Sequence, residues 1–281
     1  MLAAVYALLA SLSWGSSDFL AGIESRRSAF WGVALLSQVA ALAGATVVLV
    51  IAWPAPPPAS ALWAALLGGV CSAVAALAQY RAFALIKMSV VSPIMAGAAL
   101  VPVSVGLARG EHPAPLQLWG VALTIAGIVI ISRPSRDAPA EHARVSRAGV
   151  LLAVLAAVTA GLLLVTLDYA GDADPYWAVA AVRFSSVVIL ACVVGLRRRG
   201  LGLREGAVPP IVLVGVLIVV ANTLFTTAST MGYLSVVAVL GYLSPAIVIF
   251  WARVVLHERL RPVQWAAAGL VITGVTCLAL G

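Results

Sequence analysis

The chain has 281 residues, of which 63% are hydrophobic and 10% charged, and its formal net charge is +7. A soluble domain carries roughly 25% charged residues, so this chain has too few polar side chains to cover a water-soluble surface. Its basic residues stand in short clusters between long apolar runs. That pattern is typical of loops at a membrane surface and argues against nucleic acid as a partner. We therefore expect an integral membrane protein in contact with lipid.

Apolar segments follow one another along the chain, and a helix that crosses a bilayer needs about 20 mostly apolar residues. In chain order the predicted helices are 2–23, 30–52, 61–85, 89–108, 114–132, 148–168, 176–196, 208–228, 234–256 and 263–280. The first lacks a basic region and a polar cleavage region, so we expect a retained helix and not a signal peptide. The predicted fold class is an all-α, multi-pass integral membrane protein of the plasma (inner) membrane, with about ten transmembrane helices.

The longest polar stretch divides the chain almost in half and indicates an internal repeat. Residues 1–132 are the first predicted five-helix repeat, 133–147 a polar linker, and 148–281 the second repeat. A shift of 146 positions aligns identical residues of the two halves, and beyond a single-residue gap the shift becomes 147. The aligned pairs include Gly15 with Gly161, Trp31 with Trp177, Gly69 with Gly215, Ser89-Val90-Val91 with Ser235-Val236-Val237, and Glu111 with Glu258.

An odd number of spans in each repeat has a topological consequence. The second repeat must enter the membrane in the opposite sense, so we predict two inverted five-helix repeats related by a pseudo-two-fold axis in the membrane plane. Inverted repeats are a transporter architecture, in which the substrate site lies near the midplane between the repeats. The alternative is an old duplication that is kept only for packing.

Three segments carry a family resemblance. They are SWGSSDF at 13–19, VPVSVGLARGEHPAPLQLWGVALTIAGIVII at 101–131 and LSPAIVIFWARVVLHERLRPVQWAAAGLVITGV at 243–275. In both longer segments, an apolar helix with a proline leads through a turn with a glutamate to a final helix punctuated by glycines. Over nearly its whole length the chain resembles the EamA family of the drug/metabolite transporter superfamily. The resemblance implies a ten-helix secondary transporter, and many members export amino acids, metabolites or drugs.

The chain departs from the family pattern at two places. Ala160-Gly161 replaces a Trp-Gly pair in the sixth helix, which makes the central site asymmetric. Pro102 lies three residues beyond Ala99, which is the repeat equivalent of Pro245. We expect the kink at Pro102 to be displaced by about one turn.

Asp18 is the first candidate binding residue, because a charged group inside a span is costly and usually marks a transport pathway. It shares a helical face with Ser11, Trp14, Gly15 and Gly22, at spacings of three or four residues. We expect this small, polar face to point into the bundle, where Asp18 would bind a coupling cation or a cationic substrate. Desolvation favours the neutral carboxyl group, which would allow a proton to be coupled to transport. The alternative is that Asp18 is hydrated near the helix end or paired with an arginine.

Arg183 lies about seven residues into the seventh predicted helix. Its planar guanidinium group would bind a substrate carboxylate or neutralise an acid, and the alternative is that it snorkels to the membrane interface. Uncharged polar residues complete the predicted site, and the alternative for each is a packing role between helices. The full set expected to line one central cavity is Trp14, Asp18, Gln38, Gln79, Arg183, Asn222 and Tyr242.

The predicted function is a secondary active transporter that exports a small amphipathic metabolite, amino acid or drug by alternating access. A channel or a structural membrane protein is the alternative, and an intramembrane enzyme is a further one. The chain has no GxGD, HExxH or P-loop sequence. The histidines lie in or beside predicted loops, and the cysteines lie in apolar segments at unrelated spacings: His112, His142, His257, Cys71, Cys192 and Cys277. We therefore expect no catalytic residue, no metal site and no cofactor.

Basic residues are distributed unevenly between the two sides of the predicted bundle. The odd-numbered loops carry the arginine clusters and Lys87, whereas Arg109 is the basic residue of the even-numbered loops. The positive-inside rule then places the odd loops in the cytoplasm and both termini outside. The family resemblance suggests termini inside, so the two lines of reasoning give opposite orientations.

Overall fold

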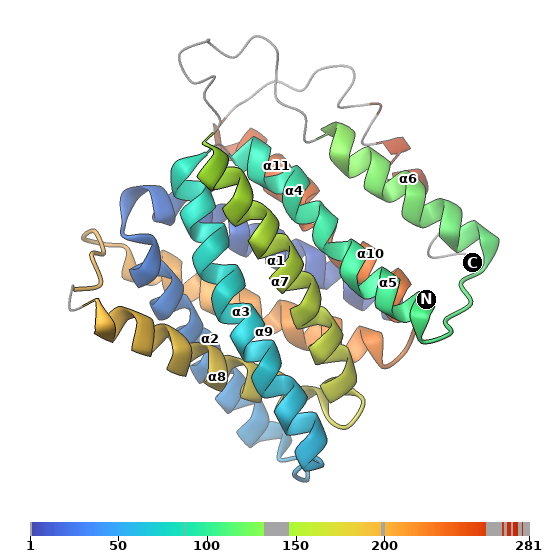
Figure 1. Ribbon diagram of the computed structural model, residues 1–281, viewed down its shortest axis with the longest axis horizontal. Coiled ribbons are helices and arrows are strands. Elements are labelled where there is room, and N and C mark those ends of the chain that lie inside the picture. The colour runs from blue at the N-terminus through green and yellow to red at the C-terminus, as the bar shows by residue number, and fades with distance from the viewer. Residues whose placement is uncertain are drawn as a thin grey trace.

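The computed structural model describes residues 2–86, 88–131, 146–197, 200–256, 266, 269–270, 272–274 and 277. All regular structure in this part of the chain is helical (Figure 1). The elements are α1 (Leu2–Arg27), α2 (Phe30–Ala52), α3 (Ala59–Leu85), α4 (Met88–Ala96), the 3₁₀ turn η1 (Gly97–Ala99), α5 (Leu100–Ala108), α6 (Pro115–Ile131), α7 (Arg147–Gly171), α8 (Pro175–Leu196), α9 (Val208–Ser229), α10 (Leu234–Gly241) and α11 (Ser244–Leu256). Described residues between 266 and 277 are also helical.

Six helical stretches are long and apolar enough to cross a membrane, and two apolar helices are shorter. The six are Phe30–Ala52, Ala59–Leu85, Val90–Ala108, Arg147–Gly171, Pro175–Leu196 and Val208–Ser229; the shorter two are Pro115–Gly127 and Leu234–Val248. α1 has 26 residues but is less apolar, because it carries several serines and Asp18. Most of the predicted linker, residues 133–145, and the predicted loop 257–262 lie outside the described residues.

Local sequence explains where several helices begin and end. The Asp174 carboxylate accepts hydrogen bonds from the backbone N–H groups of Tyr176 and Trp177 at 2.9 and 2.8 Å. Pro175 follows as the first residue of α8, where its missing N–H and its fixed φ are favourable. α2 ends at Ala52, and Trp53 after it has a left-handed conformation with φ of 44°. The next residue is a proline that cannot continue the helix.

Two predicted helices are interrupted. The segment predicted at 89–108 contains the 3₁₀ turn Gly97–Ala99, and the segment at 234–256 breaks between α10 and α11. In each case a proline follows the interruption, and its missing N–H leaves a carbonyl group one turn earlier without its helical partner. With the 146 shift, residues 242–243 of the second break correspond to 96–97. The first interruption begins at residue 97 and the second at the equivalent of residue 96, so the two lie one residue apart and not the expected turn.

Contacts at one end of the bundle bring loops of both halves together. The Ala29 N–H donates a hydrogen bond to the Gly202 carbonyl at 2.9 Å, which joins the α1–α2 loop to the α8–α9 loop. Gly149, in the first turn of α7, lies against Ile86 at the end of α3. We term this the basic end, because Arg26, Arg27, Arg147, Arg197 and Arg204 lie there.

The opposite end is joined by a second set of contacts. The Trp177 indole N–H, at the start of α8, donates to the Pro54 carbonyl after α2 at 3.3 Å. Arg109, after α5, forms an ion pair with Asp168 near the end of α7 at 2.8 Å. Consequently α1 ends at the basic end, whereas α7 begins there and runs in the opposite direction.

The interior is built from small residues, and large apolar residues cover the outside. α3 packs on α7 and α8, α1 on α9, and α2 on α8 and α9, while α6 lies at the periphery (Figure 1). Alanines dominate the buried core, whereas Ile51, Trp63, Leu151 and Leu196 are each more than half exposed. Small residues allow helices to approach closely in lipid, which cannot drive their association by the hydrophobic effect. The exposed apolar surface is therefore the surface that lipid would cover.

Candidate functional site

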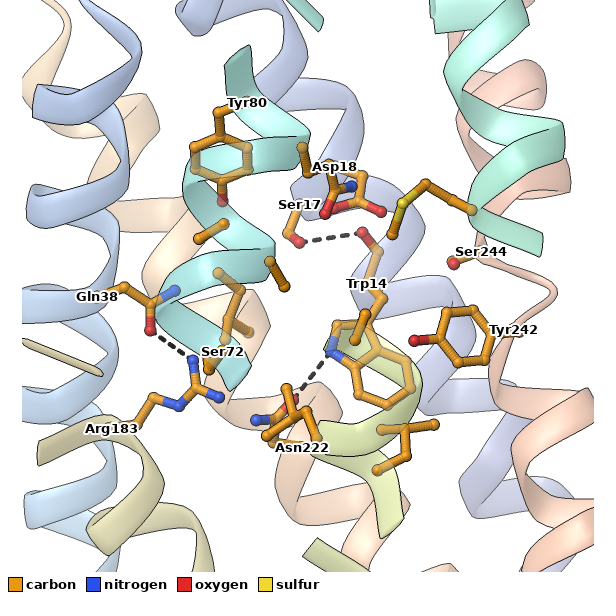
Figure 2. Close-up of a pocket in the computed structure, with 18 residues that line it drawn as sticks. Trp14, Ser17, Asp18, Gln38, Ser72, Tyr80, Arg183, Asn222, Tyr242 and Ser244 are labelled. Carbon is orange, nitrogen blue, oxygen red and sulfur yellow. Dashed lines mark hydrogen bonds between the residues drawn. The ribbon is translucent and has the colours of Figure 1, made fainter. Parts of the chain in front are cut away.

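A cavity lies in the middle of the bundle, where residues of α1, α2, α3, α4, α7, α8 and α9 meet the break between α10 and α11 (Figure 2). The volume of the cavity is about 90 Å³, which is smaller than the roughly 300–1,000 Å³ of sites for drug-sized ligands. The structure brings all seven sequence-predicted residues together in its lining: Trp14, Asp18, Gln38, Gln79, Arg183, Asn222 and Tyr242.

Aromatic rings form one wall of the cavity. The Trp14 ring is stacked on that of Tyr242, with centroids 6.3 Å apart, and is tilted against Phe225 at 5.5 Å. The indole N–H of Trp14 donates a hydrogen bond to Asn222 Oδ1 at 3.0 Å. Tyr242 reaches this position because α10 ends just before it. The break in the helix therefore supplies an aromatic surface on which an apolar part of a ligand can lie.

Arg183 is buried at the cavity rather than at the membrane surface. Its residue exposure is 1%, and its Nη1 donates a hydrogen bond to Gln38 Oε1 of α2. The ion pairs among the described residues are Arg109 with Asp168 and Arg204 with Glu24, and both lie towards the ends of the bundle. Arg183 thus has a neutral partner and no carboxylate within ion-pair distance in the described part of the chain. The expected alternative, snorkelling to the interface, does not describe its position.

Asp18 faces the same cavity from α1 (Figure 2). The helix continues to Arg27, so Asp18 does not stand at its end. None of the ion pairs among the described residues involves it. The structure therefore does not match the alternative in which Asp18 is hydrated at the helix end or paired with an arginine.

Several buried polar atoms at the cavity have no hydrogen-bond partner among the residues that the structure describes. They include Arg183 Nε, Asn222 Nδ2 and Gln79 Nε2. Buried polar groups are nearly always paired with protein or with water, and each exception requires an explanation. These atoms are themselves buried, so a ligand or a water molecule can pair with them only when the cavity opens further.

Sequence reasoning missed several polar residues of the lining: Ser17, Ser72, Tyr80 and Ser244. Spacing could have found two of them. Ser17 lies three residues after Trp14, and Ser72 lies seven residues before Gln79, so each shares a helical face with a predicted residue. Among the described residues, no group of histidine, cysteine, aspartate and glutamate side chains is arranged to hold a metal ion.

Comparisons with known proteins agree with this architecture. A solved structure titled "Crystal structure of protein" superposes with a TM-score of 0.80 at 18% identity, covering 99% of this chain and 98% of that chain. At that identity the likeness establishes the fold alone. No curated protein matches the chain. The model of the EamA-like transporter family matches residues 147–280. The second half of this multi-pass membrane protein is thus similar to the EamA-like transporter family, which belongs to the drug/metabolite transporter superfamily.

Proposed function

We propose that the chain is a secondary active transporter of the plasma (inner) membrane that exports a small amphipathic metabolite, amino acid or drug. The ligand would bind in the central cavity, and the two halves would rock to expose it to each side in turn. The observation that carries the proposal is Arg183, a buried charge at mid-bundle with no acidic partner among the described residues. Such a charge in a membrane bundle is costly and marks a ligand pathway.

Equivalent glycine contacts support two inverted repeats around this cavity. A Cβ atom added at Gly15 would lie 2.8 Å from a carbonyl oxygen, and a Cβ atom added at Gly161 would lie 2.5 Å from another carbonyl oxygen. The contacts are Gly15 with the Ser244 carbonyl and the Ile247 side chain, and Gly161 with the Ala98 carbonyl and the Val101 side chain. Subtracting 146 from 244 and 247 gives 98 and 101. The sequence register therefore relates the partners as well as the glycines.

Helix direction and packing support the same proposal. α1 and α7, which the register pairs, run in opposite directions between the two ends of the bundle. The register pairs α1 with α7, α2 with α8 and α3 with α9. Under this pairing, the contact of α3 with α7 corresponds to that of α1 with α9, and the contact of α3 with α8 corresponds to that of α2 with α9. Inverted repeats of this kind allow a transporter to open alternately to either side of a fixed site. We propose that Asp18 binds the coupling proton or cation in that site.

A thermal-stability screen of the purified protein against metabolites and drugs would identify ligands, because a ligand that binds the folded state raises its apparent stability. Each stabilising compound would then be tested for flux into proteoliposomes, with protein-free liposomes as the control. We expect a flux that saturates with concentration and accelerates when unlabelled compound is present on the other side. A flux that rises linearly and ignores the opposing compound would identify a channel, and no flux for any stabilising ligand would contradict transport.

A further inference from the structure

Two hydrogen bonds fix the orientation of two amide side chains in the cavity. An indole N–H and a guanidinium group can only donate. Asn222 must therefore turn its oxygen towards Trp14, and Gln38 must turn its oxygen towards Arg183. Both amide oxygens accept hydrogen bonds within the protein, and the NH₂ group of each amide points away from that hydrogen-bond partner. In Figure 2 the amide nitrogen of Asn222 lies on the side that faces Arg183.

The donors that remain at this end of the cavity are unpaired. Arg183 Nε and Asn222 Nδ2 have no hydrogen-bond partner in the described part of the chain, and each residue is 1% exposed. A buried donor without an acceptor is costly, more so when it belongs to a charged group. Both residues line the cavity, and we take their two buried donors as groups for which a ligand supplies the acceptors once the cavity opens further.

The charge of Arg183 specifies which acceptor fits. No described carboxylate forms an ion pair with it, so an anion is the complementary ligand group. A planar carboxylate matches the fork of a guanidinium group and accepts two hydrogen bonds from it. A phosphate dianion would fit less well, because Arg183 is the one cationic side chain among the described residues of the lining and Asp18 lies in the same cavity.

We infer that the Arg183 end of the cavity is a carboxylate-binding subsite in which Arg183 and Asn222 contact the ligand. Gln38 and Trp14 are positioning residues, because they hold the guanidinium group and the Asn222 amide with their N–H groups towards the cavity. The inference rests on the proposed function and narrows its substrate class to compounds with one carboxylate group. It also assigns to Asn222 a part in discriminating among substrates.

Matched ligand pairs test the subsite directly. Benzoate, phenylacetate and hexanoate would each be titrated into the purified protein beside benzamide, phenylacetamide and hexanamide, with phenyl phosphate as the phosphate arm. We expect at least one carboxylate to bind, and to bind at least about tenfold more tightly than its amide, because the amide cannot accept as an anion. Equal binding within every pair, tighter binding of phenyl phosphate than of the carboxylates, or no binding of any carboxylate would overturn the inference.

Two variants separate positioning from folding. Gln38→Glu places a carboxylate beside Arg183 and should occupy the guanidinium group, which lowers carboxylate affinity at least about tenfold without loss of thermal stability. Asn222→Asp exchanges the free donor for a charge that repels a carboxylate. Gln117→Glu is the matched control, since Gln117 lies on α6 outside the cavity and its oxygen accepts from the Ala114 N–H at 2.9 Å. Both cavity variants should reduce the ratio of carboxylate to amide affinity, and a ratio unchanged in both would overturn the inference.

The outcome distinguishes this inference from the proposed function. Saturable flux of neutral or cationic compounds, with no carboxylate bound, would retain the transporter and overturn the subsite. Carboxylate binding that depends on Gln38 and Asn222, without flux of any bound compound, would retain the subsite and overturn transport.

Discussion

Glu111 and Leu234 are 123 positions apart, yet the Glu111 carboxylate accepts a hydrogen bond from the Leu234 backbone N–H at 2.8 Å. Its second oxygen accepts from the Ser235 N–H at 3.1 Å. These N–H groups belong to the first turn of α10 and have no partner within the helix. A negative charge at a helix N-terminus also interacts favourably with the helix dipole. A residue of the first half thereby holds the start of the helix that leads to Tyr242.

Replacing Glu111 is expected to destabilise the protein. Glu111→Ala should lower the free energy of unfolding by about 1–2 kcal/mol, as for other lost helix caps. Glu111→Gln retains one acceptor and should lose less. Unfolding in mixed detergent micelles would measure both changes, with Glu205→Ala, an exposed residue of the α8–α9 loop, as the control. Stability equal to wild type in both Glu111 variants would show that the two hydrogen bonds contribute nothing.

Replacement by alanine should have different effects on the stability of the protein at two glycines. A Cβ atom at Gly69 would lie 2.6 Å from the Val182 carbonyl oxygen, whereas a Cβ atom at Gly97 would meet no atom within 4 Å. Gly69→Ala should therefore push α3 away from α8 and cost about 1–3 kcal/mol. Gly97→Ala should be neutral or stabilise slightly, because it restricts the unfolded chain. Thermal unfolding of both variants measures the difference, and equal midpoints would refute the close approach of α3 and α8.

Hydropathy predicted the helices well, because every backbone group in lipid must be paired within its own helix. It placed the end of α1 at residue 23, whereas the helix continues to Arg27. Glu24 is buried there by an ion pair with Arg204 at 2.6 Å, 180 positions away. A partner so distant in sequence leaves no local signal. The sequence predicted one helix over 234–256 and did not predict the break after α10, although Pro245 removes a backbone N–H just beyond it.

The sequence predicted the longer polar residues that line the candidate cavity, but it did not predict the serines of the lining. A charged side chain within a membrane helix usually faces the bundle interior, so Asp18 and Arg183 were predicted at the site, with a helix-end or interfacial position as the alternative. Ser17 donates to the Trp14 carbonyl of its own helix at 3.0 Å. A serine satisfied in this way is ordinary in a helix and carries no sign of a cavity. The Trp14–Asn222 hydrogen bond required the tertiary structure, because its residues lie in different halves.

Ligand binding should weaken even when Arg183 is replaced by a residue that keeps the positive charge. Arg183→Lys is expected to weaken ligand binding by about tenfold or more, because a point charge loses the bidentate geometry of the guanidinium group. Arg183→Ala should weaken it further. Titration with a ligand found in the stability screen provides the measurement, and thermal unfolding checks that both variants fold. Unchanged affinity in two folded variants would assign Arg183 to packing.

The distribution of arginines predicts the orientation in the membrane. The basic end should face the cytoplasm, which places the α2–α3 loop outside. Pro57→Cys in that loop and Glu205→Cys at the basic end would each be made in a protein without Cys71, Cys192 and Cys277. A membrane-impermeant thiol reagent added to intact cells should label the first variant and not the second. The reverse pattern would place both termini in the cytoplasm, as the family resemblance suggested.

Asp18 provides the sharpest test of coupling. An ionised carboxylate that leaves water for a cavity wall loses hydration, so its neutral form gains relative stability unless a cation is near. Asp18 would then take up a proton on one side and release it on the other as the cavity changes its opening. Asp18→Asn keeps the size of the side chain but cannot ionise. We expect the variant to fold normally and to lose proton-driven transport or the binding of a cationic ligand. In the proton-coupled case, exchange of ligand across the membrane should survive, because exchange needs no net proton movement. Transport by Asp18→Asn that equals wild type in rate, affinity and pH dependence would instead show that Asp18 only shapes the cavity wall.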